Sequence, residues 1–121
     1  MITFTSETNN RVFTVYDNNF HFIQKLLLHD LTVGNTIVQP NSWLGIESAT
    51  VLALNISNFI KSNSIYEFQS GGLVEPLINP TEEQLKTLKH CIRPLSSKRK
   101  DFLVKFTDYL LENGSFNIES V

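Results

Sequence analysis

The chain has 121 residues and a formal net charge of −2, and hydrophobic residues make up 41% of it. This length predicts one globular domain over residues 1–121, and the apolar content excludes global disorder. A single cysteine, Cys91, excludes an intrachain disulfide and fits a reducing compartment. No signal peptide begins the sequence and no apolar stretch is long enough to span a membrane, so we expect a cytoplasmic protein without a membrane partner.

The charge is distributed unevenly along the chain. Residues 1–85 carry eight acidic and three basic side chains, a balance of −5. Residues 86–105 carry seven basic side chains and one acidic one, a balance of +6, and the last sixteen residues add −3. The sequence therefore predicts an acidic body with a basic segment near its end. The net negative charge disfavours a general nucleic-acid binder.

The first forty residues predict strands around one helix. Residues 2–5 and 11–16 are rich in β-branched and aromatic side chains that alternate with polar ones, which predicts two strands joined by a hairpin loop. Over residues 17–30 the apolar period changes to that of a helix. Residues 31–40 are strand-like and stop at Pro40.

The clearest amphipathic pattern of the first half predicts a helix over residues 41–63, with Asn41 or Ser42 as its N-cap. Its apolar stripe would face the core, and its Asn and Ser side chains would face water. Residues 64–70 alternate in polarity and predict a strand. Residues 71–80 carry two glycines and two prolines, which predicts a loop or a broken edge strand.

Two helices and a strand follow. The first helix, over residues 80–92, begins with Thr81 as N-cap and Gln84 three residues on, which is a capping-box pattern. The second, over residues 96–114, starts at a serine cap and ends at a glycine, and the last seven residues add a strand. The overall prediction is an α+β fold: a small, mostly antiparallel sheet of about four or five strands packed with about four helices. The last two helices are expected to form a C-terminal helical pair.

The basic segment over residues 86–105 has two interpretations. Basic side chains beside the free amides of a helix start can hold a phosphate, and the candidates are Lys98, Arg99, Lys100 and Lys105. The simpler interpretation is a solvated helix start. No helix-turn-helix, zinc-finger or RNA-recognition pattern accompanies the segment. A nucleic-acid-binding or regulatory module that uses it is therefore the alternative function.

The sequence holds no pattern that names a catalytic chemistry. His21 and His29 lie eight residues apart on one predicted helix, about 12 Å along its axis, so they cannot share a metal there. Cys91 lies near the apolar side of its predicted helix, where a lone cysteine is inert packing. No glycine-rich phosphate loop is present. We expect no metal, no cofactor and no catalytic residue, and a small enzyme without a recognisable motif is the second alternative.

A small domain with an acidic body and no catalytic motif is typical of proteins that bind another macromolecule. Trp43 follows a predicted cap position. It is structural if it packs under a loop, and it is a natural binding anchor if it is exposed. The candidate contact residues are Trp43, Glu47, Tyr66, Glu67, Glu75, Glu82 and Glu83.

The chain resembles the immunity proteins of bacterial toxin systems, including those of contact-dependent growth inhibition. The resemblance lies in its size, its single α+β domain, its Asn-rich composition and the helix within residues 41–60, which an acidic loop region follows. It implies a protein-binding inhibitor whose acidic groups face a cognate toxin, for example a basic nuclease, in the cytosol. It leaves open whether the protein is a monomer or a homodimer.

Overall fold

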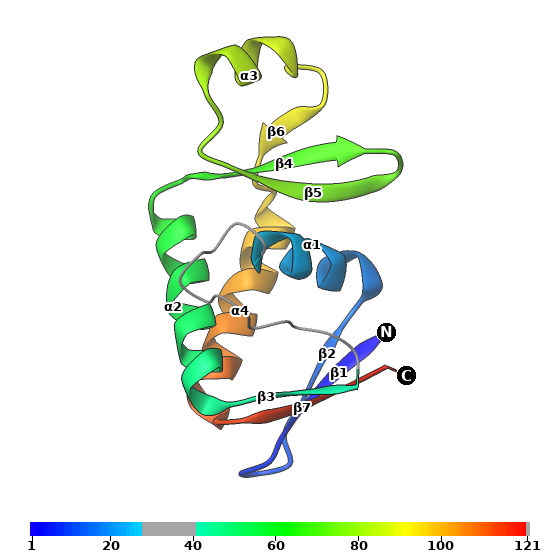
Figure 1. Cartoon of the computed structure of the whole chain (residues 1–121), viewed down its shortest axis with the longest axis vertical. Helices are drawn as coiled ribbons and strands as arrows, with labels where there is room; N and C mark the ends of the chain where they lie inside the picture. Colours follow the sequence, from blue (N-terminus) through cyan, green and yellow to red (C-terminus); the bar gives the residue numbers. More distant parts are fainter. Residues whose placement is uncertain (28–40, 121) are drawn as a thin grey trace.

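A computed structural model describes residues 1–27 and 41–120 and shows an elongated molecule with a sheet at either end (Figure 1). Two long helices, α2 and α4, run side by side between the sheets. In chain order the described elements are β1 (Ile2–Ser6), β2 (Val12–Val15), α1 (Asp17–Leu27), β3 (Ser42–Leu44), α2 (Ile46–Lys61), β4 (Ile65–Ser70), β5 (Leu73–Ile78), α3 (Glu82–Thr87), β6 (Ile92–Pro94), α4 (Ser97–Asn113) and β7 (Phe116–Ser120).

The predicted α+β class is confirmed, and the described strands form two antiparallel sheets instead of the one that we expected. The larger sheet has the strand order β2-β1-β7-β3, so strands from the two ends of the chain pair in its centre. The smaller sheet has the order β5-β4-β6. The N-terminal hairpin forms as predicted, with Ile2 opposite Val15 and Phe4 opposite Phe13. The predicted C-terminal strand also forms, as β7.

The main core lies between the larger sheet and α4. Because side chains alternate along a strand, Ile2 and Phe4 of β1 point inward together and are buried. The ring of Phe4 meets that of Phe106 edge-on, with the ring centroids 5.2 Å apart. The hydroxyl of Tyr109 donates to the carbonyls of Phe4 and Arg11, at 2.9 and 2.6 Å. These bonds connect α4 to the β1–β2 hairpin. The core therefore lies on one face of the larger sheet, and we call the opposite face the outer face.

The helix that packs on α4 is α2, not the preceding helix α3 as predicted. The stripe of Ala49, Leu52, Ala53 and Ile56 along α2 is buried, and so is Leu103 of α4. α3 has no buried residue and lies beyond the smaller sheet (Figure 1). It therefore presents no apolar face that α4 could cover.

Two predicted helices have different bounds in the structure. Asn41 and Ser42 do not cap α2, because β3 pairs with β7 and the helix begins only after Gly45. α3 ends at Thr87, because residues 92–94 pair with β4 instead of continuing the helix. In both places a strand pairing that links distant parts of the chain overrides a local helical pattern.

Other local predictions are confirmed. Thr81 and Gln84 form both bonds of the capping box, and Ser96 accepts a bond from the first turn of α4. Gly114 ends α4 with a φ of 82°, a conformation that favours glycine. Of the loop and the broken edge strand predicted over residues 71–80, an edge strand forms as β5, and it is unbroken from Leu73 to Ile78. The strand predicted over residues 31–40 lies outside the described residues, as do the last residues of the first predicted helix.

Candidate functional site

The face of the larger sheet opposite the core carries one row of side chains across all four strands. In the strand register, Val12 lies opposite Thr5, Thr5 opposite Asn117, and Asn117 opposite Trp43. Val12 and Trp43, at the two edges, are 56% and 61% exposed. The core lies on the other side of the sheet, and within residues 1–27 and 41–120 the side chains of Val12, Trp43 and Asn117 are exposed.

Trp43 is exposed but held in place. Its indole N–H donates to the carboxylate of Glu7, which also accepts a 2.8 Å bond from the hydroxyl of Ser115. The ring also lies against Gly45, where an added Cβ would come within 2.9 Å of the indole Cη2 atom. Gly45 has an extended backbone that any residue adopts, so the close ring, not the backbone, is what favours glycine. A Trp fixed by a hydrogen bond and a neighbouring backbone loses little side-chain freedom when a partner covers it.

The surroundings of Trp43 are acidic. The hydrogen bonds from Trp43 and Ser115 lower the pKa of Glu7, so this side chain is a carboxylate at neutral pH. Glu47 is exposed in the first turn of α2. Glu119 lines a shallow depression of about 500 Å³ together with Trp43. We call Glu7, Trp43, Glu47, Asn117 and Glu119 the Trp43 surface.

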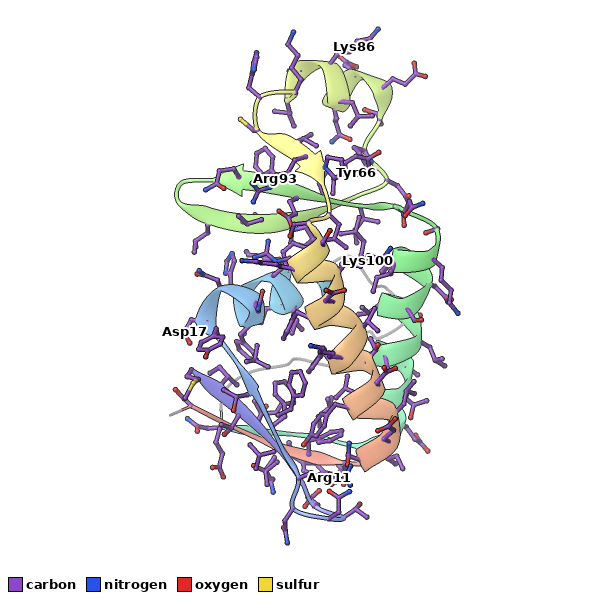
Figure 2. The ribbon with its side chains drawn as sticks, turned by 180° about the vertical axis from the view of Figure 1, so that it is seen from behind. Arg11, Asp17, Tyr66, Lys86, Arg93 and Lys100 are labelled. Atoms are coloured by element: carbon purple, nitrogen blue, oxygen red, sulfur yellow. The ribbon has the colours of Figure 1, made fainter. Side chains whose placement is uncertain are left out.

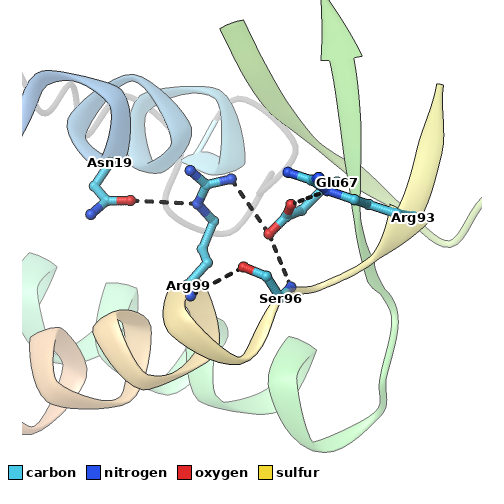
Figure 3. A network of polar contacts seen from close by, with 5 residues as sticks. All are labelled: Asn19, Glu67, Arg93, Ser96 and Arg99. Carbon is cyan, nitrogen blue, oxygen red and sulfur yellow. Dashed lines mark hydrogen bonds and ion pairs between the residues drawn. The ribbon is translucent and has the colours of Figure 1, made fainter.

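Glu67, a predicted contact residue, is buried, which removes it from the accessible surface. It is 1% exposed and accepts bonds from the Arg93 Nε at 2.7 Å and the Ser96 N–H at 3.0 Å (Figure 3). Arg93 donates to Oε2 and Ser96 to Oε1, and the guanidinium Nη1 of Arg99 lies 3.4 Å from Oε1. Burial acts to raise the pKa of Glu67, but the bonds from Ser96 and Arg93 and the charge of Arg99 hold it below its ordinary value.

Arg99 is one of the four candidate anion-binding residues, and its guanidinium already makes contacts with other residues of the protein. It is 14% exposed, pairs with Glu67, donates to the Asn19 side chain at 3.4 Å and lies 4.6 Å from the ring centroid of Phe22 (Figure 3). These contacts join α1, β4 and α4. Burial lowers the pKa of Arg99, and the charge of Glu67 opposes that effect.

The other three candidate basic residues do not form one patch. On a helix, residues seven apart share a face, whereas residues two apart lie about 200° apart. Lys98 and Lys105 therefore share one side of α4, and Lys100 lies on another. Lys105 lines a depression with Arg11, and Lys100 lines a different pocket with Tyr66. Figure 2 shows the labelled Tyr66 and Lys100 in the upper half of the molecule and Arg11 near its lower end.

The remaining predicted contacts lie away from Trp43. The carboxylate of Glu75 forms a 3.2 Å hydrogen bond with Nε2 of His21, and this bond connects β5 to α1. Glu82 and Glu83 are exposed on α3, at the opposite end of the molecule (Figure 1). The predicted acidic contacts thus divide between two ends. The structure adds Glu7 and Glu119 to the end that holds Trp43, and no sequence signal distinguishes them from other surface carboxylates.

Catalytic features are sparse in the part of the chain that the structure describes. Residues 1–27 and 41–120 contain no group of three His, Cys, Asp or Glu side chains that could hold a metal ion. Cys91 is exposed, so the prediction that it is packed on an apolar helix face is wrong. The reason is that α3 ends before it and the chain turns into β6. No described helix has both the length and the apolar character that a membrane span requires.

Comparison with protein-family models, with curated proteins and with solved structures finds no match. The argument for function therefore starts from the contacts of this chain's own side chains. Among these, Trp43 combines high exposure with a fixed position.

Proposed function

We propose that the protein is a protein-binding inhibitor of the toxin-immunity type, which binds and neutralises a cognate bacterial toxin in the cytoplasm. The observation that carries the proposal is the exposed and fixed Trp43 among carboxylates. Exposed tryptophans are enriched among the few residues that supply most of an interface's binding energy. On the outer face of the larger sheet Trp43 ends a row formed by Val12, Thr5 and Asn117, which a partner can cover without displacing any described element.

The charge of the Trp43 surface supports a basic partner. Glu7, Glu47 and Glu119 give this end of the sheet a local negative charge, and complementary charge speeds the encounter of two proteins. Nucleases are basic because they bind phosphates, and a nuclease toxin would present the matching lysines and arginines. Covering those side chains would keep nucleic acid out of the toxin's active site.

The test is neutralisation of a toxin in cells, followed by binding measurements. Toxin domains encoded next to this chain's gene are expressed with and without the protein, and growth is recorded. For a toxin that is neutralised, affinity is measured by calorimetry with wild-type protein and with Trp43→Ala. Loss of a hot-spot tryptophan costs about 2 kcal/mol or more, so we expect binding at least about 30-fold weaker.

The contribution of charge is tested with two matched double variants. Glu47→Lys with Glu119→Lys reverses two charges beside Trp43, and we expect slower association at low salt with a smaller effect at high salt. Glu82→Lys with Glu83→Lys reverses two exposed charges on α3 and serves as the control. Unchanged binding by Trp43→Ala, or a loss of binding only with the α3 pair, would overturn the proposed surface. Failure of every neighbouring toxin domain to be neutralised would overturn the immunity function.

A further inference from the structure

A pocket lies at the end of α2 far from Trp43, between the C-terminal end of that helix, β4 and the segment that joins β6 to α4. Its volume is about 180 Å³. Its lining combines apolar side chains with one amide, one phenol and one ammonium group: Phe59, Ile60, Asn63, Ile65, Tyr66, Pro94, Leu95 and Lys100. No residue of the Trp43 surface takes part in it, so the two regions are separate.

The walls of the pocket are apolar and supported from behind. Ile65 is part of the buried core, and Phe59, Ile60 and Leu95 pack against that core while remaining partly exposed. A cavity of about 150 Å³ with such walls accommodates benzene, whereas pockets for drug-sized molecules measure about 300–1,000 Å³. The pocket is therefore large enough for one aromatic ring or one branched aliphatic group, and too small for a nucleotide.

Lys100 gives this apolar pocket a positive charge. Its ammonium group makes no ion pair with any residue within 1–27 and 41–120, and the pocket lining contains no carboxylate. One ammonium group balances one negative charge, so it suits a carboxylate better than a phosphate dianion. Charge-assisted hydrogen bonds of this kind are stronger than neutral ones. The phenol of Tyr66 and the amide of Asn63 add two more polar groups to the lining.

We propose that this pocket binds a monocarboxylate that carries a single aromatic ring or branched aliphatic group. The apolar group lies against Phe59, Ile60 and Leu95, and the carboxylate pairs with Lys100. This site shares no residue with the Trp43 surface, so its test does not depend on the outcome of the toxin-binding test.

The test is an NMR titration of the folded, full-length protein with 3-phenylpropanoate. We expect saturable shifts of the backbone amides that line the pocket and no comparable shifts in the larger sheet. The matched neutral ligand is 3-phenylpropanamide, which has the same ring without the charge. Loss of a hydrogen bond to a charged group weakens binding by about tenfold or more, which is the expected difference between the two ligands.

Lys100→Gln and Lys98→Gln separate the pocket from general charge effects. Both variants remove one exposed positive charge from the first turns of α4, and only Lys100 lines the pocket. We expect Lys100→Gln to weaken binding of 3-phenylpropanoate by about tenfold and Lys98→Gln to leave it unchanged. Absence of saturable shifts, equal binding of acid and amide, or equal effects of the two variants would each overturn the proposal.

A final titration identifies the source of the carboxylate. The tripeptide Gly-Gly-Phe presents the same ring beside the free carboxylate of a chain end. Binding as tight as that of 3-phenylpropanoate assigns the pocket to peptide C-termini. Binding that is much weaker assigns it to free small acids, because the peptide backbone does not then fit at the mouth.

Discussion

Replacement of Glu67 by alanine tests the buried network that joins the smaller sheet to α1 and α4. The carboxylate accepts the N–H of Ser96 at 3.0 Å and the Nε of Arg93 at 2.7 Å, and the guanidinium of Arg99 lies 3.4 Å away. Through these contacts one side chain of β4 holds β6 and the first turn of α4. Arg99 in turn reaches Asn19 of α1.

The cost of Glu67→Ala follows from what the substitution leaves behind. The N–H of Ser96 loses its partner; this bond is partly buried, so the loss lies toward the lower end of the range of about 1–3 kcal/mol that a fully buried donor costs. Arg99 loses its counter-ion while only 14% exposed, whereas Arg93, at 63% exposed, regains water at little cost. Removal of one partner from a buried ion pair costs about 3–5 kcal/mol in total. Because Arg99 keeps its contacts with Asn19 and with an aromatic ring, we expect the lower part of that range.

The assay is urea unfolding followed by circular dichroism, with the slope m compared between variants. A loss of about 3 kcal/mol in the free energy of unfolding corresponds to a fall in Tm of about 12 °C for a chain of this size. Glu112→Ala removes an exposed carboxylate of α4 and is the control, with a change within about 0.5 kcal/mol. A loss below about 1 kcal/mol for Glu67→Ala would refute the reasoning. It would mean that the free energy needed to bury the Glu67 carboxylate is as large as the free energy that its hydrogen bonds and ion pairs supply.

Three further predictions concern single contacts. Tyr109→Phe removes the hydroxyl whose proton is shared between the backbone carbonyls of Phe4 and Arg11, and we expect a loss of about 1–2 kcal/mol in urea unfolding; an unchanged midpoint would contradict it. In Gly45→Ala the added methyl group pushes the indole of Trp43 away from the carboxylate of Glu7, so the NMR resonance of the indole N–H should move while the fold is retained. An unmoved resonance would show that the hydrogen bond to Glu7 is kept, and it would contradict this prediction. The pKa of Glu67 is lower in the folded than in the unfolded protein, so its stabilising contribution is complete above about pH 4.3 and is lost as the pH falls through the lowered value. Glu67→Gln should therefore flatten the acid limb of a stability–pH curve, and an unchanged limb would assign that limb to other carboxylates.

The sequence by itself determined the features that depend on neighbours a few residues away. Alternating β-branched and aromatic side chains predicted β1, β2 and β4, because a strand repeats every two residues. The caps Thr81, Ser96 and Gly114 marked helix ends through bonds or conformations within one turn. These local signals were sufficient for the α+β class.

The functional surface was only partly visible in the sequence. Trp43 and Glu47 were identified as candidate contacts because aromatic and acidic residues suit an interface with a basic protein. Glu67 was placed in the same group, because nothing in its own neighbourhood reveals that Arg93 and Arg99, 26 and 32 positions later, meet it in the interior. The same carboxyl group is a surface charge or a buried counter-ion according to what folds against it.

Only the tertiary structure decided which distant segments pair. β3 became a strand because β7, more than 70 residues later, offers it a free edge, and this pairing moved Trp43 from a helix start to the outer face of the larger sheet. Glu7 then fixed the indole across 36 residues of sequence. A hydrogen bond within one helical turn needs no other part of the chain, whereas an edge pairing or a buried ion pair forms only when the whole fold brings its partners together.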